Sequence, residues 1–152
     1  MLQLFKVAEI ELVYRSKIKA KDRTVITHSF DAYEILRKTW DDNKIELLEQ
    51  FKILLLDRKN ACLGINEISS GGTDSCLIDP KLIFMTALKA NASAIVLAHN
   101  HPSGSLRESQ ADIDLTKKIM QAGDFLGIRV LDHLIITADG YTSFEDKALM
   151  PR

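Results

Sequence analysis

Runs of hydrophobic residues, and stretches in which hydrophobic and polar residues alternate, predict strands along much of the chain. Residues 51–56 form a nearly unbroken apolar run, and residues 61–68 alternate after the turn-forming segment DRKN, so together they predict a β-hairpin. The apolar run at 93–98 predicts a strand that is buried on both faces. Further patterns predict a first strand at 7–14 and a closing hairpin with Asp139-Gly140 at its turn.

Hydrophobic residues at helical spacing, next to helix-capping residues, predict three helices between these strands. Residues 32–40 show this spacing and follow Ser29, a suitable N-cap. Asp79-Pro80 is typical of a helix start and precedes a second helical pattern at 82–89. Ser109 begins a third helix, which runs to about Phe125 and stops at Gly127. Interleaved strands and helices indicate an α/β fold with a mixed β-sheet sandwiched by helices.

Length and composition suit one soluble globular domain that spans residues 1–152. The chain is 46% hydrophobic and 27% charged, without a repeat or a linker-like tract. A chain of this size does not depend on disulfides to fold, so Cys62 and Cys76 are expected to be free thiols. No secretory signal or membrane-spanning stretch is visible, so we expect a cytoplasmic protein with no membrane association.

The charge of the chain gives no general attraction to nucleic acid, because the formal net charge is -1. One local exception is a series of cations at every second position: Arg15, Lys17, Lys19, Lys21 and Arg23. On an extended strand these side chains would share one face. An edge strand that its lysines protect against unwanted pairing is the favoured interpretation, and a stripe that binds the phosphates of DNA is the alternative.

Two histidines follow the apolar run at 93–98, and a carboxylate follows on the next predicted helix. In an extended chain His99 and His101 point to the same side, about 6.6 Å apart, and can converge on one ion. Asp112 lies seven residues before Ile119 of the apolar helical stripe and therefore faces inward. An inward carboxylate is costly unless it meets a cation. Together these residues predict a zinc site whose fourth position stays open for water.

Two further polar residues fit this chemistry. On the alternating strand, Glu67 shares the face of three apolar residues, Ala61, Leu63 and Ile65, so it is expected to face inward and to act as a general base. Ser109 lies one turn before Asp112 and can donate a hydrogen bond to an oxyanion.

Each of these residues also has a purely structural interpretation. Residues 109–112 match the capping box, His99 fits a satisfied core histidine, and Glu67 fits a solvated strand end. One metal site explains all of these residues together, so we favour it.

The run HNHPSG at 99–104, with Ser109 and Asp112, resembles the JAMM/MPN metalloprotease motif. Together with NASAIVLAH, the GGT at 71–73 and RVLDH at 129–133, it is similar to the RadC-type branch over about residues 50–145. The resemblance implies cytidine-deaminase-like layering, and zinc ligands at His99, His101 and Asp112. It also implies a general base at Glu67 and an oxyanion-stabilising serine at Ser109.

Longer RadC-type proteins carry an N-terminal helix-hairpin-helix region suggestive of DNA contact. The first 40 residues here show no glycine-bearing helical hairpin, so we expect the core domain alone.

The leading hypothesis is a zinc-dependent metallohydrolase of the peptidase or isopeptidase type, whose substrate is a peptide or a protein. The alternative is a DNA-repair-associated, DNA-binding module in which the metal site is structural or vestigial. A phosphodiesterase ranks lower because only one set of metal ligands is visible, and two-metal sites are usual for that chemistry.

Overall fold

The fold is built around one mixed β-sheet, which we describe from a computed structural model covering residues 6–72 and 77–152. The strand order is β2-β1-β3-β4-β5; β3 and β4 are parallel, and the other neighbours are antiparallel. The strands are β1 (Gln50–Leu56), β2 (Cys62–Ser70), β3 (Ala94–Asn100), β4 (Arg129–Ile136) and β5 (Tyr141–Ser143). Both predicted hairpins and the buried strand are therefore confirmed.

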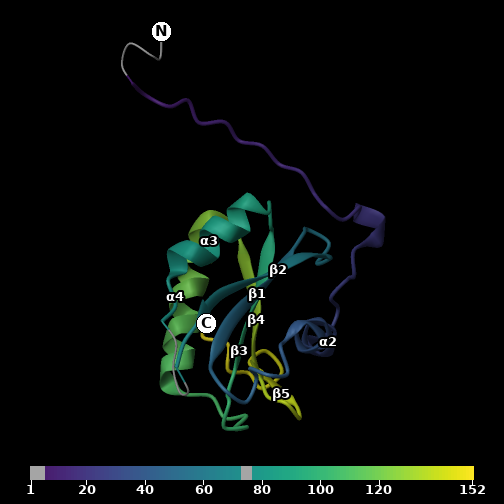
Figure 1. Cartoon of the computed structure of the whole chain (residues 1–152), viewed down its shortest axis with the longest axis vertical. Helices are drawn as coiled ribbons and strands as arrows, with labels where there is room; N and C mark the ends of the chain where they lie inside the picture. Colours follow the sequence, from purple (N-terminus) through teal and green to yellow (C-terminus); the bar gives the residue numbers. More distant parts are fainter. Residues whose placement is uncertain (1–5, 73–76) are drawn as a thin grey trace.

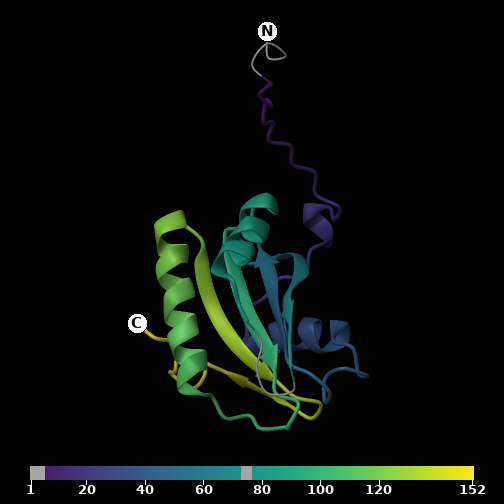
Figure 2. The same cartoon turned by 60° about the vertical axis from the view of Figure 1, so that its left-hand side comes forward.

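Helices cover both faces of this sheet, as predicted. α2 (Ser29–Thr39) lies on one face, and α3 (Pro80–Lys89) and α4 (Gln110–Leu126) lie on the other (Figures 1 and 2). A short 3-10 helix, η1 (Ala20–Asp22), precedes α2. None of the helices in the described parts of the chain has the length and apolarity that a membrane span requires.

The strands β1 and β3 are buried along their whole length, and their apolar residues supply a core on each face. Leu54 and Val96 point to the α2 side and pack with Leu36 and Trp40. Their neighbours along the strands point the other way, where Ile53 and the residues around it pack against α3 and α4. A strand with two buried faces has no position for a solvated side chain.

The helix ends follow local rules, with one difference from the prediction. The Asp79 side chain accepts a hydrogen bond from Lys81 N at the start of α3, and Gly127 ends α4 with a φ of 71°. For α2 the N-cap is His28, one residue before the predicted Ser29. The reason is the carboxylate of Asp31, which accepts hydrogen bonds from the backbone of His28 and of Thr27.

The predicted strand at 7–14 is wrong. These residues are exposed, pair with no strand in the described parts of the chain, and extend away from the domain (Figure 1). Strand formation needs a hydrogen-bonding neighbour, which a sequence pattern does not supply. Cys62 is a free thiol, as expected, while Thr73 and Cys76 lie outside the described residues.

The predicted single basic face over residues 15–23 is also wrong. The chain bends after Ser16 and forms η1 around Lys21, so alternate side chains do not line up. Arg23 is withdrawn from solvent and forms an ion pair with Asp57, with Nη1 and Oδ2 2.9 Å apart. Arg15, Lys17, Lys19 and Lys21 stay exposed.

Gly123 gives a test of how closely α4 packs. A Cβ at this position would collide with the carbonyl oxygen of Ile128, whose own N–H caps the helix by bonding to Gly123 O. Gly123→Ala should therefore lower the free energy of unfolding by about 1–3 kcal/mol, measured by urea denaturation. Gly64→Ala is the matched control, because a Cβ there meets nothing within 4 Å. Equal stability of the two variants would contradict this packing.

Candidate metal centre

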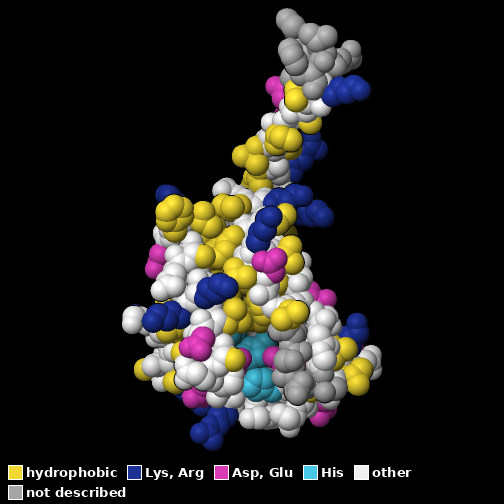
Figure 3. Space-filling model, turned by 90° about the vertical axis from the view of Figure 1, so that its left-hand side faces the viewer, with side chains coloured by type: hydrophobic (Ala, Val, Ile, Leu, Met, Phe, Trp, Pro, Cys, Tyr) yellow, Lys and Arg dark blue, Asp and Glu magenta, His cyan; other side chains and the backbone are white. Residues whose placement is uncertain are grey.

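Histidine side chains lie in a recess of the molecular surface with acidic side chains beside them (Figure 3). They come from the end of β3, where His99 is 2% exposed and His101, just past the strand, is 18% exposed. Their Nε2 atoms are 3.0 Å apart. The structure thus brings the two imidazoles together on the side of the sheet that α4 covers, where the His99 ring stacks on Phe51.

A tight turn holds His101 against the end of the sheet. Its backbone N–H donates to Ile136 O, and its carbonyl accepts from Gly104 N. Gly104 has a φ of 83°, a conformation that favours glycine. The turn also brings Ser105 O within 2.8 Å of His101 Nδ1. Because a carbonyl can only accept, Nδ1 of His101 carries the proton, and in the neutral ring Nε2 is left with a lone pair.

Asp112, in the first turn of α4, reaches both histidines. Its Oδ1 is 3.4 Å from His99 Nε2 and its Oδ2 is 3.8 Å from His101 Nε2. Burial alone would raise the pKa of Asp112, but the nearby His99 and the backbone N–H of Ser109 outweigh it and hold the pKa well below its ordinary value. Asp112 is therefore an ionised carboxylate directed at two imidazoles.

Ser109 is the N-cap of α4, and its hydroxyl oxygen accepts from Asp112 N at 3.0 Å. In return, Asp112 Oδ2 accepts from Ser109 N at 2.9 Å. The capping box that was one interpretation of these residues is confirmed. It still leaves the hydroxyl proton of Ser109 available to another acceptor.

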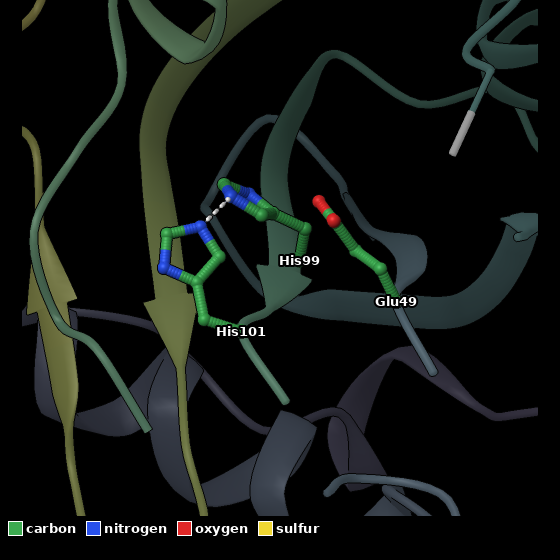
Figure 4. A group of neighbouring side chains, drawn as sticks. All are labelled: Glu49, His99 and His101. Atoms are coloured by element: carbon green, nitrogen blue, oxygen red, sulfur yellow. Dashed lines mark hydrogen bonds between the residues drawn. The ribbon is translucent and has the colours of Figure 1, made fainter. Parts of the chain in front are cut away.

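Glu49, the residue immediately before β1, completes the group. One carboxylate oxygen of Glu49 and one nitrogen of each histidine all lie within 4.8 Å of one another, and the three side chains point toward a common centre (Figure 4). The backbone of Glu49 is bonded on both sides to the loop after β2, since its N–H donates to Gly72 O and its carbonyl accepts from Gly71 N.

Sequence reasoning missed Glu49. The only signal lies in strand pairing: Phe51 is opposite His99, and the residue two positions earlier shares the face of Phe51. That register is a tertiary property and cannot be obtained from hydrophobic periodicity.

Glu67 does not join this group, and the prediction that it faces inward with Ala61, Leu63 and Ile65 is wrong. Its side chain is exposed. In the β1–β2 register Glu67 lies opposite Lys52, whose ammonium group lies over Trp40 on the α2 side of the sheet. Its carboxylate accepts from Gln50 Nε2.

The physical reason is a break in the β1–β2 register. Leu56 pairs with Cys62 and Leu55 with Gly64, so Leu63 has no opposite residue. This bulge sends Leu63 to the α3–α4 side while Cys62 and Ile65 face α2.

Behind the two histidines lies a third, His133 of β4, to which sequence reasoning assigned no role. It is fully buried, and its Nε2 is 2.8 Å from His99 Nδ1. Burial and the neighbouring His99 hold the pKa of His133 well below its ordinary value. Burial also lowers the pKa of His101.

This donor set fits a metal ion. Zinc holds its ligands tetrahedrally at about 2.0–2.1 Å, which places neighbouring ligand atoms about 3.3 Å apart. The 3.0 Å between the two Nε2 atoms and the 3.4 Å between His99 Nε2 and Asp112 Oδ1 are close to that spacing, and the other oxygen of Asp112, Oδ2, is 3.8 Å from His101 Nε2. Two imidazoles with one carboxylate form a ligand set that zinc prefers, and Glu49 lies near enough to act as a fourth group.

Comparisons with known proteins identify the family to which the chain belongs. The family model described as "RadC-like JAB domain" matches residues 26–149. The UPF0758 protein of Moorella thermoacetica is 39% identical over 143 residues, and that of Syntrophomonas wolfei 35% over 144; each alignment covers 94% of this chain and 61% of the relative. The UPF0758 protein tlr1707 of Thermosynechococcus vestitus is 48% identical over 98 residues, which are 64% of this chain and 39% of the relative.

The chain thus spans less than two thirds of the length of these relatives. The family match covers the sheet, all three α-helices and the complete histidine and carboxylate group. The resemblance found in the motif at 99–112 is confirmed, and the chain belongs to the RadC-like JAB domain family.

Proposed function

We propose that this protein is a zinc-dependent metallohydrolase that cleaves an amide bond of a peptide or protein, with His99, His101 and Asp112 as the zinc ligands. The observation that carries the proposal is the meeting of two imidazole Nε2 atoms, 3.0 Å apart, with an ionised carboxylate within 3.4 Å. Membership of a JAB-domain family supports the same class of chemistry.

Zinc bound there would act as a Lewis acid and bring the pKa of a bound water to about 7. Glu49 takes the role of general base in place of Glu67, because its carboxylate lies beside the histidines while Glu67 lies on the opposite face. Glu49 accepts the proton of the attacking water and delivers it to the leaving nitrogen. Ser109 donates its hydroxyl proton to the oxyanion that forms at the carbonyl.

The assignment of Asp112 as a ligand, rather than Glu49, rests on distance and orientation. Asp112 directs one oxygen toward each histidine, and the Ser109 backbone holds the carboxylate in this direction. Glu49 approaches the same nitrogens from the β1 side. Its carboxylate lies within 4.8 Å of a nitrogen of each histidine, which suits a group that handles protons beside the ion.

Metal analysis tests the ligand set. Purified protein should hold about one zinc per chain by elemental analysis, and His99→Ala should lose it because a tetrahedral site with two protein ligands is weak. His28→Ala is the matched control, since His28 is exposed and lies at the start of α2. Zinc retained in His99→Ala at the level of the control would contradict the site.

The general base is tested by Glu49→Gln, which keeps the size of the side chain but removes its basicity. Cleavage of a quenched-fluorescent peptide and isopeptide library should fall by about 100-fold or more, with bound zinc unchanged. Glu67→Gln should cleave at the wild-type rate. Equal rates for wild type and Glu49→Gln would remove Glu49 from the mechanism, and no cleavage by zinc-loaded wild type across both libraries would count against a hydrolase.

DNA association remains a separate proposal, supported by the exposed cations Arg15, Lys17, Lys19 and Lys21. The slope of log affinity against log salt is negative for phosphate contacts. If these cations contact phosphates, charge reversal at Lys17 and Lys19 should make the slope shallower by about 2. Reversal of Lys117 and Lys118, two exposed lysines of α4, is the matched control. A slope that is equal in both double variants would contradict DNA contact by this segment.

A further inference from the structure

His133 lies directly behind His99 in the core, with neither ring near solvent. The two ring centroids are 4.8 Å apart at an interplanar angle of 63°, and His133 Nε2 is 2.8 Å from His99 Nδ1. Phe51 and Phe144 flank the His133 ring, with centroids at 5.7 and 4.7 Å. A second proton on His133 would place a charge between these phenyl rings, which is costly, so the neutral imidazole is the stable form.

The other nitrogen of His133 meets the hydroxyl group of Thr116, and this contact fixes where the protons lie. Thr116 Oγ1 is 2.6 Å from the carbonyl oxygen of Asp112 and 2.6 Å from His133 Nδ1. A carbonyl oxygen can only accept, so the hydroxyl proton points to Asp112 O. If the hydroxyl proton pointed elsewhere, Thr116 Oγ1 and Asp112 O would lie 2.6 Å apart with only lone pairs between them, and they would repel each other. The hydroxyl oxygen therefore accepts a proton that His133 Nδ1 carries.

The remaining proton positions follow along the chain of contacts. Neutral His133 with a proton on Nδ1 has a lone pair on Nε2, so His99 must donate from Nδ1 across the 2.8 Å contact. His99 Nε2 is then unprotonated and faces His101 Nε2, which the Ser105 carbonyl leaves unprotonated in the same way. Two lone pairs 3.0 Å apart repel unless a cation lies between them.

We propose that Thr116 and His133 are positioning residues that hold His99 in the one tautomer able to bind a metal through Nε2. This inference rests on the proposed metal site and adds to it the means by which the buried ligand is prepared. A backbone carbonyl, that of Ser105, fixes the tautomer of His101. The tautomer of His99 is fixed by two side chains, which can be changed by substitution. Substitutions of outer partners of this kind typically weaken metal binding by about 10–100-fold.

The tautomers can be read directly from the imidazole ¹⁵N and ¹H chemical shifts of the full chain after metal removal. We expect His133 to be protonated on Nδ1 alone, with Nε2 as an acceptor. A proton on Nε2 of His133 would overturn the proposal. This measurement needs neither bound zinc nor a substrate, so its outcome is independent of whether the protein is a hydrolase.

Zinc affinity, measured by competition with a chromophoric chelator, tests the consequence. His133→Phe and Thr116→Val should each bind zinc about 10–100-fold more weakly than wild type. Thr116→Ser keeps the hydroxyl and should bind as wild type does. Thr137→Val is the matched control, because Thr137 is buried and its hydroxyl bonds to Gly140 O in the closing hairpin.

Urea unfolding of the same variants separates positioning from loss of fold. Weaker zinc binding in Thr116→Val at a stability equal to that of Thr137→Val supports positioning. Wild-type affinity in Thr116→Val and His133→Phe, alongside loss of zinc in His99→Ala, would overturn the role of these two residues and leave the metal site in place. Weak binding by wild type itself would instead overturn the proposed function.

Discussion

The pairing register of the three central strands is the constraint on which the site depends. β1 and β3 are buried on both faces, and a slip of one residue would turn every side chain to the opposite core. With the register fixed, Phe51 lies opposite His99, and Leu97 of β3 lies beside His133 of β4. Glu49 reaches the histidines because it extends β1 by one residue on this same register. The hydrophobic cores therefore position the polar residues.

Burying His99, His133 and Thr116 in that core is tolerated because each of them has a hydrogen-bond partner. His99, His133 and Thr116 form one connected series that ends on a backbone carbonyl of α4. Such networks are stable when every member is satisfied and costly when one is lost. Asp112 uses one carboxylate for two purposes, since Oδ2 caps the helix and Oδ1 lies nearest to His99. The capping and metal-ligand interpretations of the sequence are for this reason compatible rather than exclusive.

The sequence predicted those parts of the fold that depend on local signals. Nearly unbroken apolar runs identified β1 and β3, and Asp79-Pro80 and Gly127 marked helix ends within a residue. The predictions were wrong where strand pairing decides which face a side chain takes. The bulge at Leu63 shifts the face of residues 64–67 of β2, up to a second break in the register at Ile68, so Glu67 lies on the α2 side.

Within the site, the three residues of the motif at 99–112 could be proposed from sequence because they lie close together along the chain. Glu49 and His133 could not. Glu49 lies just before β1 and His133 lies in β4, and the antiparallel β1–β3 and the parallel β3–β4 pairing bring them next to the histidines of the motif. Their roles depend on distances between residues 34 and 50 positions apart, and no periodic pattern encodes those distances.

The unequal burial of the three nitrogen and oxygen donors sets an order for ligand exchange. His101 and Asp112 are 18% and 15% exposed, whereas His99 is 2% exposed and lies deepest. At the proposed metal centre, an ion arriving from solvent would meet the outer pair before it reached the inner imidazole, and on departure its bond to that imidazole would break last. The kinetics of metal exchange at such a centre would therefore depend on the turn at 101–105, which carries His101, while His99 is held within the sheet.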